Sequence, residues 1–205
     1  MPFIEAVIVV AALAAALSLR PWRQRGVAQL LTPMLASLVL LPWLWALPAL
    51  RTSPFQLQWS AAPLVVLMLG WPLAVPVLCI AGVAAALIAG FGAMQAIDLI
   101  AWLGIVPATL ALALGAAIRR FVGTHPFVYV LGRGFLGSVL CLFAASALRQ
   151  WSGEALPGVD SGLSMVARWL TAWGDGFVTG MLCAIFVAYR PQWLATWSDA
   201  LYLGH

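Results

Sequence analysis

Long apolar stretches alternate with short polar links along this chain of 205 residues. The first two stretches, Phe3 to Leu19 and Val27 to Leu50, are separated only by a short Arg-rich link. Helices that are apolar on every face belong in a lipid bilayer, where about 20 apolar residues span the hydrocarbon. The pattern predicts seven spans, the other five lying near residues 59–69, 73–89, 96–118, 125–148 and 163–189.

The composition supports the same conclusion, since 64% of the residues are hydrophobic and only 8% are charged. A water-soluble chain of this length has too little interior to bury so much apolar surface. We therefore predict an all-α, polytopic integral membrane bundle that forms a single transmembrane domain over residues 1–205. The lipid bilayer is its first expected partner.

The basic residues, all ten of them Arg, orient the predicted bundle. Because Arg residues concentrate in cytoplasmic links, seven spans with the amino terminus outside and the carboxyl terminus in the cytoplasm fit best. This topology leaves only Arg51 and Arg149 on the outer side. The Arg residues form no continuous basic stripe, so nucleic acid is not expected as a partner. The cytoplasmic Arg residues would be Arg20, Arg23, Arg25, Arg119, Arg120 and Arg190.

Ionisable residues inside the predicted spans are the main functional signal, because a charge in hydrocarbon is costly unless it is paired or hydrated. Glu5, Asp98 and Arg168 lie within about two helical turns of the predicted outer ends. They could form one outward-facing polar cluster with Gln56 and Gln58. We take Glu5, Gln58, Asp98 and Arg168 as the candidate substrate-binding residues.

Arg133 and Asp175 lie at similar predicted depths, nearer the cytoplasmic face. We predict an intramembrane ion pair between them, serving either as a structural lock between two helices or in transport and coupling. Asp175 and Thr179 are four residues apart and should share one helix face. Gly176 and Gly180 on the same helix form a small-xxx-small pair that admits a neighbouring helix closely.

The sequence lacks the short motifs that mark common enzymes and cofactor sites. The run Gly132 to Gly137 matches GxGxxG by letter but lies in an apolar span with no preceding strand, so it does not indicate a dinucleotide site. Cys79, Cys141 and Cys183 share no CxxC spacing, and the histidines are His125 and His205. We therefore expect no enzyme activity, no cofactor and no resident metal site.

The carboxyl-terminal third carries a family resemblance. The run Asp175 to Met181 and the segment Tyr189 to Asp199, followed by Tyr202 and Leu203, resemble the end of CbiM-like energy-coupling factor (ECF) ABC transporter permeases, particularly their uncharacterised proteobacterial branch. Leu67 to Trp71 gives a second match. The resemblance implies a multi-pass protein of the bacterial inner (cytoplasmic) membrane that binds a solute for import.

The resemblance also implies where a metal would bind, because members that take up cobalt or nickel carry an amino-terminal MH-type motif and a histidine before the equivalent of Gly70-Trp71. This chain has Pro2 and Gln58 at those positions. Imidazole is a good ligand for divalent transition metals and an amide side chain is a poor one. These departures weigh against transition-metal uptake.

Two functional hypotheses follow. In the first, the chain is the substrate-binding permease component of an ECF-type importer and works with a coupling subunit and ATPases. In the second, it is a non-transporting accessory or assembly subunit of a larger respiratory or photosynthetic membrane complex.

Overall fold

The computed structural model describes residues 2–20, 27–50, 58–153, 161–198 and 202. All regular elements in these ranges are helical, which confirms the predicted all-α fold. Short 3-10 turns (η2, η5) and π-helical stretches (η3, η4) accompany the α-helices. In chain order the elements are α1 (Pro2–Ser18), η2 (Val27–Leu30), α2 (Leu31–Leu50), α3 (Ala62–Leu69), α4 (Trp71–Ala89), α5 (Ala93–Leu99), η3 (Ile100–Ile105), α6 (Val106–Phe121), η4 (Val128–Leu136), α7 (Gly137–Trp151), α8 (Ser161–Tyr189) and η5 (Pro191–Trp193).

Five helices in the described ranges are long and apolar enough to cross a membrane. α1 is equally apolar but shorter. Several helices continue into one another, so that α5, η3 and α6 make one span and η4 and α7 make another. The five spans are Ala28–Leu50, Trp71–Ala89, Ala93–Phe121, Val128–Trp151 and Gly162–Tyr189. The chain is therefore a helical membrane bundle, as the sequence predicts.

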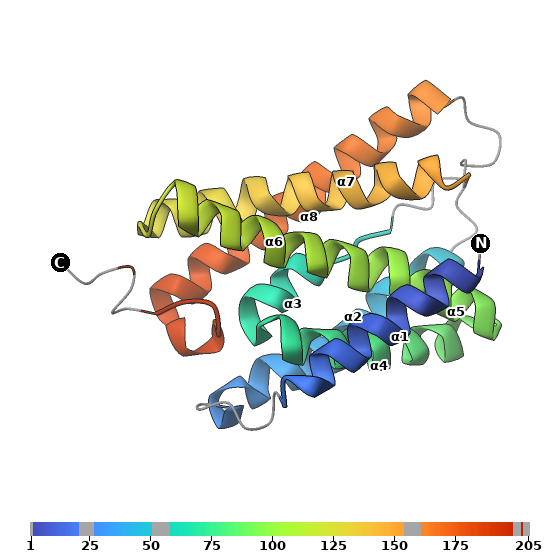
Figure 1. The fold of residues 1–205 in the computed structure, drawn as a ribbon, viewed down its shortest axis with the longest axis horizontal. Coiled ribbons are helices and arrows are strands. Elements are labelled where there is room, and N and C mark those ends of the chain that lie inside the picture. Colours follow the sequence, from blue (N-terminus) through green and yellow to red (C-terminus); the bar gives the residue numbers. More distant parts are fainter. Residues whose placement is uncertain (1, 21–26, 51–57, 154–160, 199–201, 203–205) are drawn as a thin grey trace.

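The long helices run roughly side by side between two ends of the bundle (Figure 1). α1 starts at the right-hand end of that view, where α7 also finishes and α8 starts. α6 and α8 finish at the opposite end. The basic pair Arg119 and Arg120 lies in the last turn of α6, and Arg190 directly follows α8. This arrangement supports the predicted grouping of these Arg residues on one side, while Arg23, Arg25 and Arg51 lie outside the described residues.

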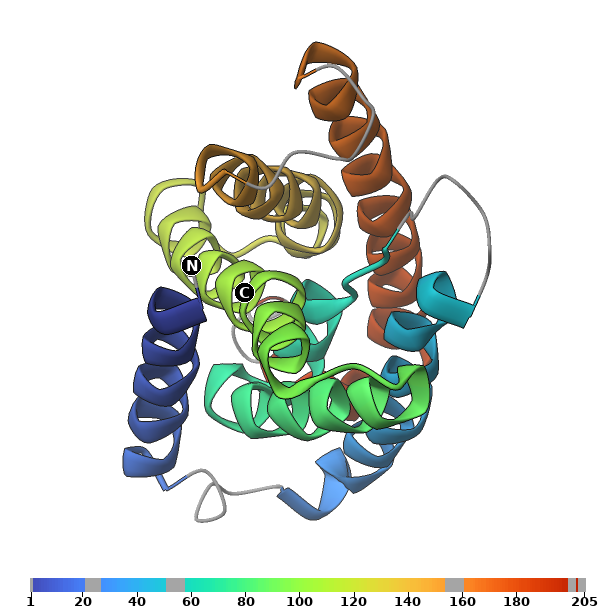
Figure 2. The same ribbon diagram turned by 90° about the vertical axis from the view of Figure 1, so that its right-hand side faces the viewer.

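The third predicted span differs from the others. Residues Gln58 to Ala61 are irregular, and α3 adds only eight helical residues, about 12 Å of length. All eight are buried, and α3 lies in the middle of the bundle with the other helices around it (Figure 2). A helix this short does not cross a bilayer by itself. It is instead a central core element that depends on its neighbours.

Packing around α3 relies on small residues in the neighbouring helices. Trp45 of α2 is fully buried. Its ring packs against Gly82 and Gly104, which have no side chains in its way. A Cβ atom added at Gly104 would lie 3.2 Å from the ring of Trp45. Glycine thus gives the tightest fit where these two helices approach the indole.

The predicted small-xxx-small pair on α8 is a close helix contact. A Cβ atom added at Gly180 would lie 2.8 Å from the Cβ of Phe135 in η4. A Cβ atom at Gly176 would collide with the side chain of Val139 in α7 and lie 3.3 Å from the carbonyl oxygen of Phe135. The two glycines therefore bring α8 close to the backbone of the η4–α7 span.

The π-helical stretch η3 has a local cause. Pro107, near the start of α6, has no N–H to donate to the carbonyl of Leu103 four residues earlier, and its ring would crowd that carbonyl. A π-helical stretch relieves this conflict within a continuous span. The Leu103 carbonyl accepts a hydrogen bond from the hydroxyl of Ser60 at 2.5 Å. The span thereby contacts the irregular segment before α3.

The carboxyl-terminal segment after α8 folds back against the other end of α3. The backbone N–H of Ala195 donates to the carbonyl of Met68 at 2.9 Å. The N–H and the hydroxyl of Thr196 both donate to the carbonyl of Leu67. Carbonyls at the end of a helix have no partner within the helix. The returning segment thus satisfies the carboxyl-terminal end of α3.

Candidate functional site

Glu5 of α1 is buried, with 7% of its surface exposed. Its carboxylate accepts a hydrogen bond from the indole N–H of Trp102 in η3 at 3.2 Å. Glu5 lies in the first turn of α1, and its carboxylate points inward to the adjacent span. Trp102 was not among the predicted site residues.

Asp98 at the end of α5 forms an ion pair with Arg149 at the end of α7, with 2.6 Å between Oδ2 and Nη2. Both side chains are about one-fifth exposed (22% and 20%). The Coulomb attraction within an ion pair this close and this shielded is stronger than on an open surface. The sequence placed Arg149 on the outer side but did not identify it as a partner of Asp98.

Arg168 of α8 is half-buried, and its Nε–H donates to the hydroxyl of Ser164 at 3.4 Å. Ser164 in turn donates to the side chain of Gln150 at 3.3 Å. Gln58 is half-buried and precedes the break before α3. Gln56 lies outside the described residues.

These contacts give the residues of the predicted polar cluster different partners. Glu5 binds Trp102, whereas Asp98 binds Arg149, and Asp98 and Trp102 lie four residues apart on one span. Arg168 is linked through the hydroxyl of Ser164 to Gln150, which directly follows Arg149 in the sequence. Glu5, Asp98 and Arg168 thus each bind a different side chain, namely Trp102, Arg149 and Ser164. Their assignment to a solute site stays a prediction.

Asp175 lies midway along α8 with 4% of its surface exposed. Its Oδ2 atom accepts hydrogen bonds from the backbone N–H of Ser60 at 2.7 Å and of Ala61 at 3.0 Å. Thr179, on the same helix face as predicted, donates to Oδ1 at 3.4 Å. The carboxylate therefore contacts the backbone just where the third segment turns into α3.

The predicted ion pair between Arg133 and Asp175 is not formed in this structure. Gly134 faces Cys183 of α8, where an added Cβ would lie 3.0 Å away, so the adjacent Arg133 turns toward α6. There a Cβ atom on Gly115 would lie 2.7 Å from Nη2 of Arg133. Similar depth along two helices does not ensure that two side chains share a face.

Arg133 instead faces the carboxyl-terminal segment. Its Nη1 donates to the hydroxyl of Tyr202 at 3.3 Å, and its guanidinium lies over the ring of Tyr129 at 5.3 Å. The Nε–H is buried and has no hydrogen-bond acceptor in the described part of the chain. Tyr129 also packs edge-on against Trp197. Arg133 therefore belongs to an aromatic cluster beside the end of α3.

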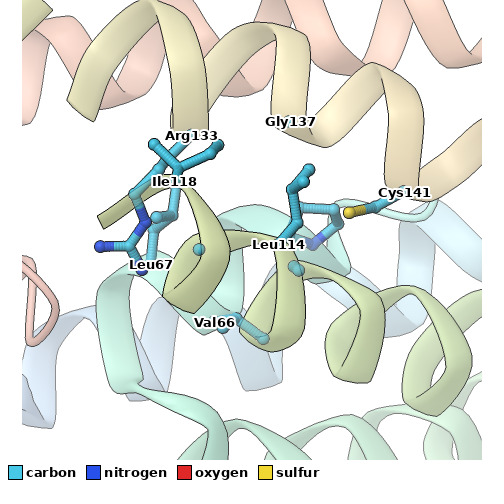
Figure 3. Close-up of a pocket in the computed structure, with 10 residues that line it drawn as sticks. Val66, Leu67, Leu114, Ile118, Arg133, Gly137 and Cys141 are labelled. Atoms are coloured by element: carbon cyan, nitrogen blue, oxygen red, sulfur yellow. The ribbon is translucent and has the colours of Figure 1, made fainter. Parts of the chain in front are cut away.

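A small cavity lies next to Arg133, between α3, α6 and the η4–α7 span (Figure 3). Its volume is about 10 Å³, the space of a single water molecule. Apart from Arg133 its walls are almost entirely apolar. It is too small to hold an imported solute. Its lining residues are Pro63, Val66, Leu67, Ala111, Leu114, Gly115, Ile118, Arg133, Gly137 and Cys141.

Sequence reasoning missed Ser60, which lies at the centre of the polar contacts. Its hydroxyl and amide bind Leu103 and Asp175, and its carbonyl accepts from the indole of Trp45 at 3.0 Å. A serine in an apolar run gives little signal on its own. Pro63 and Pro107 could have pointed to Ser60. Each proline lacks a backbone N–H, and Ser60 makes a hydrogen bond close to each of them.

No three His, Cys, Asp or Glu side chains come together within the residues that the structure places. Pro2 has no backbone N–H and Gln58 has an amide side chain, as the sequence indicates. The donor set at these two positions is therefore unlike a histidine site.

The comparisons with other proteins identify the family. No curated protein and no solved structure matches the chain. The CbiM family profile, described as "Cobalt uptake substrate-specific transmembrane region", matches residues 2–193. This match covers all the described helices. It includes Leu67 to Trp71 and the run Asp175 to Met181, and it ends within the segment Tyr189 to Asp199. The chain therefore belongs to the CbiM family of membrane transport components.

Proposed function

We propose that this chain is the substrate-binding membrane component of an ECF-type importer in a bacterial inner membrane. It would select a small solute, while a separate coupling subunit and ATPases supply energy. The family match over residues 2–193 is the observation that carries this proposal. The chain has no nucleotide-binding motif of its own, so it needs such partners.

The candidate solute site includes Glu5, Gln58, Asp98 and Arg168. These residues supply carboxylate, amide and guanidinium groups, and the first three belong to segments that meet around η3. Charged groups inside a membrane bundle are costly unless they serve a contact or a ligand. Such a set suits a polar solute better than an apolar one.

We propose further that the solute is not a histidine-coordinated transition metal. Pro2 and Gln58 replace the two histidines that the family resemblance implies for cobalt or nickel. Isothermal titration of untagged protein with cobalt, nickel and zinc tests this directly. We expect no tight stoichiometric binding. Tight binding of any of these ions would show that Pro2 and Gln58 do not prevent metal uptake.

α1 offers a surface for the coupling subunit. Ala12 and Ala16 pack inward against the core, whereas Ala11 and Ala15 are exposed. Exposed small residues four apart let a partner helix approach closely within a membrane. The α1 face that carries Ala11 and Ala15 is therefore where we place the coupling subunit.

The accessory-subunit hypothesis is favoured by one observation. The same two replacements, Pro2 and Gln58, fit a chain that keeps the family fold after losing its metal ligands. Purification from native membranes distinguishes the two functions. Recovery with an ATPase pair and a coupling subunit supports the importer. Stoichiometric recovery with a respiratory or photosynthetic complex supports the accessory role.

A further inference from the structure

The break before α3 places backbone amides in the middle of a membrane bundle. In hydrocarbon an unsatisfied N–H or C=O group costs several kcal/mol, so irregular backbone persists there only when the protein supplies partners. Asp175 provides them for the amides of Ser60 and Ala61. The hydroxyl of Ser60 accepts from the amide of Ala62, and Pro63 has no amide to satisfy. The amides of Ser60, Ala61 and Ala62 at this break thereby all have partners.

The geometry at this break is that of an anion site formed by the two amides, of Ser60 and Ala61, that directly precede a short helix. The first N–H groups of a helix point out of its end, and its dipole favours negative charge there. In membrane transporters, broken helices use such ends to hold anionic groups at the bilayer midplane. Here the chain supplies its own anion, a carboxylate buried midway along α8.

The backbone amides at the start of α3 are also the main groups that stabilise the negative charge of Asp175. Arg133 faces α6 and the carboxyl-terminal segment, so its guanidinium does not pair with the carboxylate. The groups around the break come from Trp45, Leu103 and Thr179, and none of them is charged at neutral pH. A buried carboxylate without these amides would lack a favourable partner.

Ser60 is held from three directions by this arrangement. Trp45 of α2, Leu103 of η3 and Asp175 of α8 bind its carbonyl, hydroxyl and amide, respectively. The next residue, Ala61, has a φ of 52°, a left-handed conformation that is strained for a residue with a side chain. The hydrogen bond from its amide to Asp175 stabilises that conformation.

We propose that Asp175 is a positioning residue for the candidate solute site. Its carboxylate fills the anion site at the start of α3, fixes the backbone of Ser60 and Ala61, and so sets the place of Gln58 two residues earlier. The part concerning Gln58 rests on the proposed function. Asp175 acts through the backbone.

Hydrogen exchange of the full-length protein in lipid nanodiscs tests this assignment. In Asp175→Ala, the amides of Ser60 and Ala61 should exchange faster by about 100-fold, the size of one to two lost charge-assisted hydrogen bonds. Formate added to this variant should restore much of the protection, because it replaces the missing carboxylate. A merely space-filling role for Asp175 would give no formate rescue.

A matched control is Asp98→Ala, which removes another intramembrane carboxylate that binds a side chain rather than the α3 backbone. It should leave the exchange of Ser60 and Ala61 unchanged with or without formate. Asp175→Asn, which preserves size and keeps one acceptor oxygen, should give intermediate protection and serves if Asp175→Ala fails to fold. Wild-type protection in both Asp175 variants, or exchange equally fast in Asp98→Ala, would overturn the proposal.

The proposed importer function is tested by a separate experiment, the recovery of partner subunits. Failure to recover a coupling subunit and ATPases would count against the proposed function, while formate rescue at Ser60 and Ala61 would still establish the positioning role. Recovery of those partners without any effect of Asp175 on exchange would uphold the importer and refute the positioning role.

Discussion

Replacing Gly180 by Ala tests the contact between α8 and the η4–α7 span. The added Cβ would lie 2.8 Å from the Cβ of Phe135 and 3.2 Å from its Cα. These atoms belong to or adjoin the backbone, so no rotation of a side chain relieves the clash. The helices must move apart.

The magnitude follows from two opposing effects. Overpacking a close contact costs about 1–3 kcal/mol, and relief from glycine in a helix returns about 1 kcal/mol. We expect Gly180→Ala to lower the free energy of unfolding by up to about 2 kcal/mol. Gly174, on the same helix, has nothing within 4 Å of an added Cβ, so Gly174→Ala should be neutral or stabilising by up to about 1 kcal/mol.

The assay is thermal unfolding of both variants and the wild type in the same detergent and again in lipid. For a chain of this size 1 kcal/mol corresponds to a Tm shift of about 2–4 °C. The two variants should therefore differ by several degrees, with Gly180→Ala lower. Equal Tm values would mean that α8 does not approach Phe135 as closely as the structure has it.

Two further contacts give predictions of their own. A double-mutant cycle of Asp98→Asn and Arg149→Met should show a coupling energy of about 1 kcal/mol, measured by unfolding, because the pair is close and largely shielded; a coupling of zero would contradict the ion pair. Thr196→Val removes the hydroxyl that donates to Leu67 and accepts from Tyr129, so it should lower stability by about 1–2 kcal/mol and speed proteolysis of the carboxyl-terminal segment; unchanged cleavage would argue against that attachment.

The long spans could be predicted because hydropathy and helix-ending residues act locally. The last span was expected to stop before Arg190-Pro191, and α8 ends at Tyr189. The fourth was expected to reach Ala89 before a glycine turn, and α4 ends there with Gly90 in a left-handed conformation. Membrane insertion selects for such uniform apolar runs, so sequence and structure agree wherever a run forms a simple helix.

The third span could not be predicted in the same way. Trp59 to Leu69 is as apolar as its neighbours, yet its first residues are irregular and only α3 is helical. Hydropathy reports burial from water and says nothing about whether backbone groups bond within the segment or to other segments. The deciding partners, Asp175 and Leu103, lie far away along the chain.

The predicted pairing of Arg133 with Asp175 failed for a related reason. Charge and depth suggested a side-chain partner, but the carboxylate binds backbone amides, which every residue except proline possesses and which leave no mark in a sequence. The rotation of Arg133 toward α6 depends on Gly115, whose importance appears only when the two spans are seen together.

These observations together explain how an interrupted segment persists in the centre of a membrane protein. Asp175 and Ser60 satisfy the start of α3, and Ala195 and Thr196 satisfy its end. Since both ends depend on residues from the last fifth of the chain, α3 cannot reach its final environment until α8 and the segment after it are in place. The short helix is therefore an element completed by the carboxyl-terminal third, the same part of the chain in which the family resemblance is concentrated.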